Sequence, residues 1–230
     1  MDLGATEWAA VFLSLKVAFW ATLVCLPFAI GVAFVLARKT FYGHSVLNAI
    51  VHAPLVLPPV VTGYVLLVLF GRTGPIGGIL NDAFGITLAF RWTGAVLAAA
   101  IMAFPLMVRA IRLAIEAVDP KLEQAASTLG VPPWRVFATI TLPLITSGIL
   151  AGMILAFAKA MGEFGATITF VSNIPNRTQT IPSAIYAALQ VPGQERNAMI
   201  LVILSACIAI GALIISEALS RRISKRIAGQ

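Results

Sequence analysis

The stretch VAFWATLVCLPFAIGVAFVLA at positions 17–37 decides what kind of protein this is. It holds 21 residues without a charged side chain, and a helix of roughly 20 apolar residues is long enough to cross the hydrocarbon core of a bilayer. The rest of the chain has the same character, because 60% of the 230 residues are hydrophobic and only 11% are charged. Charged residues make up about a quarter of a soluble domain. We therefore expect an all-α membrane protein.

Five segments are apolar and long enough to be membrane spans. They are residues 8–37, 46–70, 92–115, 144–162 and 198–219. The first is too long to cross upright, and we expect it to break near Lys16, whose amine can reach the headgroups. Residues 181–190 are too few for a span and predict a short external or re-entrant helix within the segment 163–197. The sequence thus predicts one domain over residues 1–230, a polytopic bundle of about five spans, with six as the alternative.

Basic residues in the loops predict the orientation of the bundle, because Lys and Arg are enriched on the cytoplasmic side. With the N-terminus outside, ten of 14 basic loop residues fall on the inner side and four on the outer side. The inner ones are Arg38, Lys39, Arg109, Arg112, Lys121, Arg135, Arg221, Arg222, Lys225 and Arg226, and the outer ones are Arg72, Arg91, Arg177 and Arg196. We expect the N-terminus outside and the C-terminus inside. Because these residues sit at the ends of apolar runs, the net charge of +7 does not indicate nucleic-acid binding.

The second apolar run, residues 46–70, contains three prolines, two of them the pair Pro58 and Pro59. Each proline removes a backbone hydrogen bond from a helix. Broken backbone at membrane depth is tolerated where it is buried in protein or lines a wet cavity. The run is therefore either a kinked helix packed among others or part of a translocation path, with Thr62 and Tyr64 as polar lining.

Lys159 and Glu163 stand four residues apart at the end of the fourth run, so on a helix they lie on one face and can pair. A buried structural ion pair is one interpretation. A role at a gate is the other, because charges inside a membrane are often functional.

Several classes of chemistry lack their motifs in this sequence. It has no phosphate-binding G-x-x-x-x-G-K-[ST] loop, no nucleophile elbow and no H-E-x-x-H pair. Cys25 and Cys207 lie within apolar runs, and the two histidines form no cluster with them. We expect no catalytic site and no metal site in this chain.

The loop of residues 119–143 is punctuated like a short independent helix. Asp119 is a suitable N-cap, Pro120 suits the first helical position, residues 121–129 have helical character, and Gly130 suits the C-terminal cap. One apolar face is formed by Leu122, Ala125, Ala126 and Leu129. The pattern alone is compatible with a helix at the headgroups or with one whose small residues admit a close partner.

The same loop resembles a family motif. Gln124-Ala125-Ala126, three residues, Gly130, nine residues, Ile140, one residue and Leu142-Pro143 are similar to the EAA loop of bacterial ABC-importer permeases, E-A-A-x3-G-x9-I-x-L-P. The resemblance implies a permease of the type I, MetI-like fold, with this loop on the cytoplasmic side and its helix in a groove of an ATPase. The first letter differs, since Gln124 follows Glu123, and either side chain can take the place of the family glutamate.

A second stretch resembles the molybdate permeases of the ModB type. It consists of GEFGAT at 162–167, SNIP at 172–175, Arg177 and TIP at 180–182. Residues 52–63 are similar too, and the likeness covers about residues 7–220. Asn176 stands where we expect a glycine after the Ile-Pro pair.

This resemblance implies a multi-pass permease of the bacterial inner membrane, surrounded by lipid, that works as a homodimer. Its implied partners are two cytoplasmic subunits, which bind ATP and Mg, and a periplasmic binding protein that delivers molybdate or tungstate. The permease itself would then bind no cofactor and hydrolyse no ATP.

If an oxyanion is carried, its path should not hold it tightly, because a deep site slows release. Hydroxyl and amide donors suit such a path better than arginine. The candidates are Thr62, Tyr64, Thr167, Thr169, Ser172 and Asn173. Lys159 would neutralise Glu163, which would otherwise repel an anion. Ordinary packing and capping roles for these groups remain the alternative.

Two other functions compete with a molybdate permease. A sulfate or other oxyanion permease of the same fold would use a similar path. A proton-coupled secondary transporter would need an intramembrane carboxylate and an inverted repeat. Glu163 is its sole credible carboxylate, and we find no convincing repeat.

Overall fold

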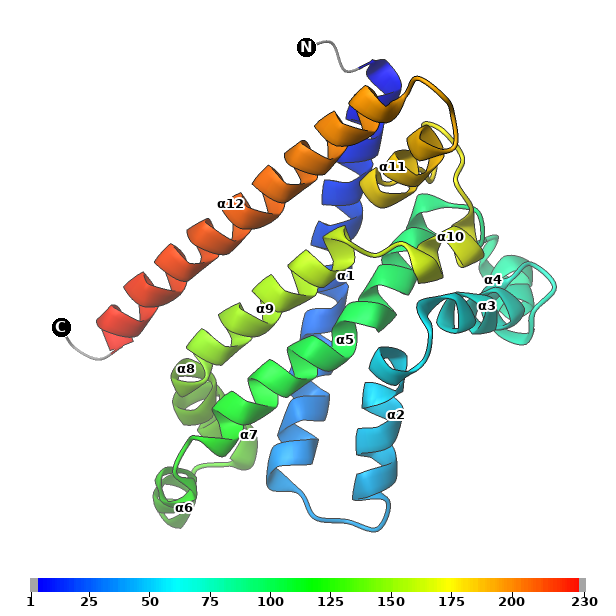
Figure 1. Cartoon of the computed structure of the whole chain (residues 1–230). Helices are drawn as coiled ribbons and strands as arrows, with labels where there is room; N and C mark the ends of the chain where they lie inside the picture. The colour runs from blue at the N-terminus through cyan, green and yellow to red at the C-terminus, as the bar shows by residue number, and fades with distance from the viewer. Residues whose placement is uncertain (1–3, 228–230) are drawn as a thin grey trace.

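The structure is a computed structural model that describes residues 4–227, and all regular structure in that range is helical (Figure 1). In chain order the elements are α1 (Ala5–Arg38), α2 (His44–Val56), α3 (Pro59–Phe70), α4 (Pro75–Phe84), α5 (Trp92–Glu116), α6 (Pro120–Thr128), α7 (Pro133–Val136), the π-helical turn η1 (Phe137–Thr141), α8 (Leu142–Leu144), α9 (Thr146–Met161), α10 (Gly165–Val171), α11 (Ile181–Leu189) and α12 (Glu195–Ile227). The predicted all-α class is confirmed.

The number of spans agrees with the prediction of about five. Three helices are long and apolar enough to cross a membrane by themselves: α1, α5 and α12, the last over Glu195–Ala212. Two bent pairs bring the number to as many as five, namely α2 with α3 and the segment from α7 to α8 with α9. The second predicted run is therefore not a straight helix, whereas the fourth, residues 144–162, is one helix from Thr146 onward with the bend at its start.

The predicted break near Lys16 is wrong, because α1 is one continuous helix of 34 residues. At about 1.5 Å per residue it is roughly 51 Å long, against a hydrocarbon core of about 30 Å, so it must tilt or project. The Lys16 ammonium lies 3.7 Å from the centroid of the Trp92 ring on α5. This cation–π contact gives the charge a partner without ending the helix.

The core is formed where α5 packs against both α1 and α9. On α5 the contact surface is largely alanine, and Ala95, Ala98, Ala99 and Ala103 are fully buried. On α9 a Cβ added to Gly148 would collide with Ala114 of α5. The small residue at this position therefore serves packing against a helix of the same chain, since small residues let two helices approach closely.

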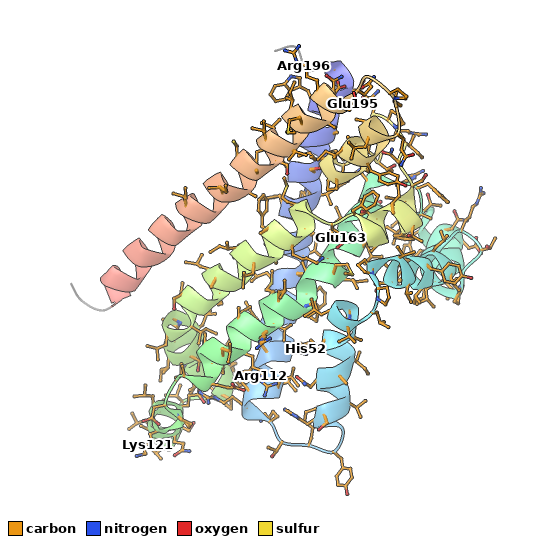
Figure 2. The ribbon with its side chains drawn as sticks, viewed as in Figure 1. His52, Arg112, Lys121, Glu163, Glu195 and Arg196 are labelled. Carbon is orange, nitrogen blue, oxygen red and sulfur yellow. The ribbon has the colours of Figure 1, made fainter. Side chains whose placement is uncertain are left out.

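The two ends of the bundle carry different elements. The start of α1 lies at one end, with α11 and the start of α12, and α6 lies at the other end (Figure 1). Figure 2 shows Lys121 at the α6 end, Glu195 and Arg196 at the opposite end and Glu163 between them. The side chains of the basic cluster at residues 221–226 lie outside the described residues. The start of α1 and α6 are thus at opposite ends of the bundle. Which end is cytoplasmic stays a prediction.

Candidate functional site

Helix α6 begins and ends as the sequence predicts. The Asp119 carboxylate accepts a hydrogen bond from the Lys121 backbone N–H, 2.9 Å away, and Pro120 occupies the first turn. Gly130 follows the helix with φ +79°, in the left-handed region that glycine adopts without steric penalty. These local signals make α6 a separate helix between α5 and α7.

The surface of α6 is uncovered in this chain. None of its residues is buried, Leu122 is 49% exposed, and Leu129, directly after the helix, is 83% exposed. Ala125 is exposed and Ala126 is half-buried. The four residues predicted to form the coupling face are therefore accessible at least in part, and its role in binding a partner stays a prediction.

Glu123, by contrast, is engaged within the chain. Its Oε1 accepts hydrogen bonds from Arg38 Nη2 at 3.2 Å and from the Thr141 hydroxyl at 2.8 Å. Its Oε2 lies 3.2 Å from Arg38 Nε. Arg38 Nη2 also donates to the carbonyl oxygen of Val118, 2.9 Å away. Glu123 therefore connects α6 to the end of α1 and to η1.

These contacts distinguish the two side chains that competed for the place of the motif's glutamate. Glu123 is held by Arg38 and Thr141, whereas Gln124 is exposed and makes no side-chain hydrogen bond with the described residues. Gln124 borders an open hollow along α6, together with Pro120. Of the two, Gln124 is the side chain that is free to meet a partner.

The end of the predicted coupling motif lies apart from this exposed surface. Ile140 belongs to η1, and Leu142 and Pro143 to α8, where the chain bends by 70° into α9. Ile140 and Leu142 are half-buried, and Pro143 is exposed. These residues shape the turn by which the loop enters α9.

The two prolines of the second run separate α2 from α3. α2 ends at Val56, Leu57 and Pro58 are extended with ψ 141° and 133°, and α3 begins at Pro59, a position where proline is favoured. The two helices are bent by 112°. The helix is therefore fully interrupted here and not merely kinked. Pro58 and Pro59 are exposed in this chain.

Glycines in both helices allow α3 to pack closely against α10. A Cβ added to Gly63 of α3 would lie 2.6 Å from the carbonyl oxygen of Ala166, and one added to Gly165 of α10 would lie 2.6 Å from Pro59 Cβ. Both distances are far below van der Waals contact, so only glycine allows this approach. The two interrupted regions of the sequence therefore meet in space, backbone against backbone.

Thr62 and Tyr64, predicted to line the path together, lie in different environments. Thr62 is only 7% exposed, and its hydroxyl has no hydrogen-bond partner among the described residues. Tyr64 is 61% exposed. Because buried hydroxyls are nearly always hydrogen-bonded, the free hydroxyl of Thr62 keeps this residue a candidate for contact with water or an ion.

The predicted Lys159–Glu163 pair forms. Lys159 Nζ lies 3.0 Å from Glu163 Oε2, and the Glu163 side chain is 2% exposed against 30% for Lys159. Glu163 Oε1 also accepts a hydrogen bond from the Ala166 N–H in the first turn of α10, 2.9 Å away. The buried carboxylate thus pairs with α9 and caps α10.

We expect Lys159→Met to lower stability more than the double variant Lys159→Met/Glu163→Gln. The single change leaves a buried carboxylate without its cation, which costs up to about 3–5 kcal/mol in a buried pair and less here because Lys159 is partly exposed. In the double variant the neutral amide still accepts the Ala166 hydrogen bond. Thermal unfolding in detergent measures the difference, and equal losses would contradict it. If the double variant also transports normally, the pair is structural and not a gate.

The remaining path candidates divide into two kinds. The hydroxyls of Thr167 and Thr169 donate to the carbonyl oxygens of Phe164 and Gly165 within their own helical turn, at 2.9 and 2.8 Å. Ser172 is exposed where α10 ends, and Asn173 is half-buried with its Oδ1 unpaired among the described residues. In this conformation the threonines are engaged, and the free polar groups lie at the start of the following loop.

The backbone conformation of that loop explains why Asn176 can stand where a glycine was expected. Asn176 has φ +61°, in the left-handed region where asparagine is the best tolerated residue after glycine. Thr178 was not among the predicted residues, and it is 1% exposed. Its hydroxyl accepts from the Ile174 N–H at 3.0 Å and donates to the Ser172 carbonyl at 3.2 Å. The available signal in the sequence was a threonine that follows a Pro-Asn turn, because threonine hydroxyls often bond to the backbone of such turns.

Comparison with known proteins gives a consistent picture. Residues 26–229 match the family model described as "Binding-protein-dependent transport system inner membrane component". The chain is 61% identical to the molybdenum transport system permease protein ModB of Escherichia coli K12 over 230 residues, which is 100% of both chains. It is 55% identical to the protein of the same name from Haemophilus influenzae over 221 residues, 96% of each chain.

The fold is shared with a solved importer. The structure superposes on a chain of a bacterial ABC transporter involved in the import of the acidic polysaccharide alginate, with a TM-score of 0.76 and 19% sequence identity. The match covers 97% of this chain and 82% of that one. At this identity the likeness concerns the fold, which is that of the type I importer permeases.

Proposed function

Because the chain belongs to the family of binding-protein-dependent transport system inner membrane components, we propose that it is the permease subunit of an ATP-driven ABC importer for molybdate. It is a multi-pass protein of the inner membrane and a component of a transport system. The observation that carries the choice of substrate is the identity to molybdenum permeases along the whole chain. Tungstate, a tetrahedral dianion of similar size, fits the same proposal.

The energetics of uptake support an ATP-driven partner. Moving a dianion inward against an inside-negative potential of about 100 mV requires about 4.6 kcal/mol. A thousandfold concentration gradient adds roughly 4.1 kcal/mol. A chain without a phosphate-binding loop cannot take about 9 kcal/mol per ion from ATP by itself, so a partner must supply it.

The exposed face of α6 is where this partner binds in our proposal. Two cytoplasmic subunits hold ATP and Mg and receive α6 from each of two permease copies, and a periplasmic binding protein delivers the oxyanion to the opposite end. This arrangement requires α6 inside and the N-terminus outside. The separation of α6 from the start of α1 supports it (Figure 1).

Reconstitution tests the proposal. In proteoliposomes, the chain with its ATPase should take up molybdate when ATP is inside and the loaded binding protein is outside, and the loaded protein should stimulate ATP hydrolysis. The chain alone should hydrolyse no ATP, because it has no phosphate-binding loop. Liposomes with ATPase but no permease are the control. ATP hydrolysis by the isolated chain, or uptake without ATP, would contradict the proposal.

A further inference from the structure

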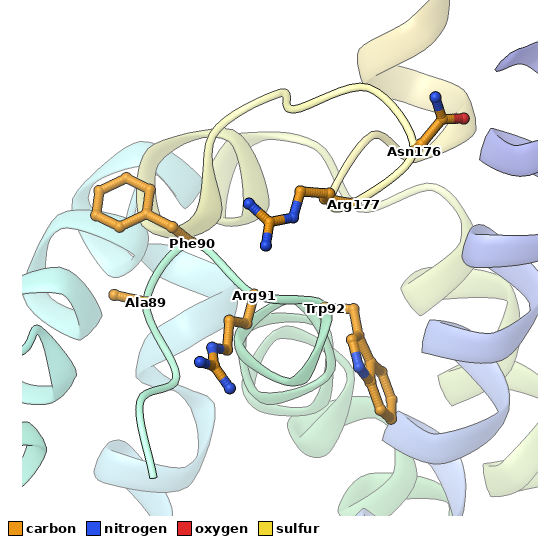
Figure 3. A pocket seen from close by; sticks show the side chains of 6 residues that line it. All are labelled: Ala89, Phe90, Arg91, Trp92, Asn176 and Arg177. Carbon is orange, nitrogen blue, oxygen red and sulfur yellow. The ribbon is translucent and has the colours of Figure 1, made fainter. Parts of the chain in front are cut away.

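A cavity with two arginines lies at the end of the molecule away from α6. It has a volume of about 550 Å³ and is lined by Ala89, Phe90, Arg91, Trp92, Asn176 and Arg177. Ala89, Phe90 and Arg91 lie in the connection between α4 and α5, and Trp92 is the first residue of α5. The other two belong to the loop between α10 and α11. Figure 3 shows the Arg177 side chain reaching from its loop toward the segment that carries Arg91, while the Asn176 amide points away.

The two guanidinium groups have no anionic partner within the described part of the chain. Neither Arg91 nor Arg177 forms an ion pair there. At this end Asp82 accepts from the Asn81 side chain and Glu195 from the Gly193 N–H. Glu7, in the first turn of α1, forms no ion pair with either arginine among the described residues. The cavity therefore carries two positive charges without a counter-ion among the described residues, and an anion bound in the cavity would be attracted to both.

Both loops are held in defined conformations. Phe90 has φ +58°, which is uncommon for a bulky residue and persists only where the surroundings enforce it. On the other side the buried Thr178, directly after Arg177, fixes its loop through two backbone hydrogen bonds. The two arginines are thus presented by ordered backbone.

The cavity also adjoins the candidate path. The loop that carries Arg177 begins with Ser172 and Asn173 at the end of α10. α10 packs against α3 next to the buried Thr62. An anion held at the cavity would lie at the start of a route that leads along α10.

We propose that Arg91 and Arg177 form an outer receiving site for the transported tetrahedral oxyanion dianion. This inference rests on the proposed function and adds a site to it. Two guanidinium groups match the charge of a dianion, and each can donate two parallel hydrogen bonds to its oxygens. The cavity volume is more than ten times the roughly 30 Å³ of one water, so a hydrated anion fits.

The exposure of both arginines makes the site weak, as transit requires. Arg91 and Arg177 are solvent-exposed, so salt weakens their attraction for an anion and largely screens it beyond about 10 Å at 0.1 M ionic strength. A weak site raises the local concentration of the anion at the mouth and still releases it. A deep arginine site would trap it.

Arginine modification tests the site in the intact complex. The permease with its ATPase, in nanodiscs and without binding protein, is treated with phenylglyoxal, and the modification of each arginine is followed by mass spectrometry. Millimolar molybdate should slow the modification of Arg91 and Arg177 several-fold relative to sodium chloride of equal ionic strength. Added salt should weaken this protection. Arg72 and Arg196, which do not line the cavity, are internal controls and should react at unchanged rates.

Two results would overturn the proposal. Equal slowing of all four arginines would show a general ionic effect. Protection by the loaded binding protein but not by molybdate would show that the arginines bind carboxylates of that protein.

Substitutions give a second measurement with a different readout. We expect Arg91→Gln/Arg177→Gln to reduce molybdate uptake severalfold while ATP hydrolysis stimulated by the binding protein persists, and Arg91→Lys/Arg177→Lys to recover part of the uptake. Arg72→Gln is the matched control. Normal uptake by the double glutamine variant would refute the receiving site and leave the importer intact, whereas absence of uptake by the unmodified complex would refute the proposed function itself.

Discussion

Ala125→Asp is expected to abolish assembly of the chain with its ATPase. Ala125 lies on the exposed face of α6 with Leu122 and Leu129, and in our proposal this face is covered by the partner. An unpaired charge buried in an interface costs about 3–5 kcal/mol, which weakens binding by about two to four orders of magnitude. Co-purification of tagged permease with the ATPase measures the effect.

Ser127→Asp provides the matched control. Ser127 is exposed on the same helix but lies about 160° around it from Ala125, by the helical rotation of 3.6 residues per turn. It introduces the same charge at a cost of only about 0.2–0.5 kcal/mol from the like-charged Glu123 four residues earlier. The complex should therefore survive. Loss of assembly in both variants, or in neither, would exclude the alanine face as the docking surface.

The start and the end of α6 could be predicted because they depend on local interactions. Asp119, Pro120 and Gly130 act through the hydrogen bonds and dihedral angles of their immediate neighbours. The same holds for the Lys159–Glu163 pair, whose members are one helical turn apart. Helix caps and pairs one turn apart depend on a few adjacent residues, so the spacing of residues in the sequence is enough to find them.

Features that depend on distant neighbours were predicted poorly. Lys16 suggested a break in the first apolar run, but Trp92 supplies a partner from another helix. The two roles open to Glu123 were separated only by Arg38, 85 residues earlier in the chain. Arg91 and Arg177 line one cavity because the chain brings their two segments to the same place. Spacing along the chain carries no information on such contacts.

The interruption after α2 is partly local and partly dependent on distant neighbours. Pro58 and Pro59 predict an interruption of the helix, and the structure has it. The bend of 112° and the position of α3 follow from its packing against α10. That packing depends on glycines in both segments, so the contact itself can be tested.

Gly63→Ala is expected to disrupt the contact between α3 and α10 and with it transport. The new Cβ would lie 2.6 Å from the Ala166 carbonyl oxygen and 2.8 Å from Thr169 Cβ. A backbone oxygen cannot rotate away as a side chain can, so α3 must shift. Overpacking of this kind costs about 1–3 kcal/mol and occasionally more. Thermal unfolding in detergent and ATP-dependent molybdate uptake in proteoliposomes measure the two effects.

Gly31→Ala separates this clash from the general effect of replacing a helical glycine. A Cβ at Gly31, inside α1, meets no atom within 4 Å, and alanine favours a helix over glycine by about 1 kcal/mol. This variant should be as stable as the parent or slightly more stable, and it should transport. Gly165→Ala, whose Cβ meets Pro59 Cβ at 2.6 Å, should behave like Gly63→Ala because it wedges the same contact from the other side. If Gly63→Ala and Gly165→Ala are tolerated as well as Gly31→Ala, close approach of α3 and α10 is not what holds the broken helix in place.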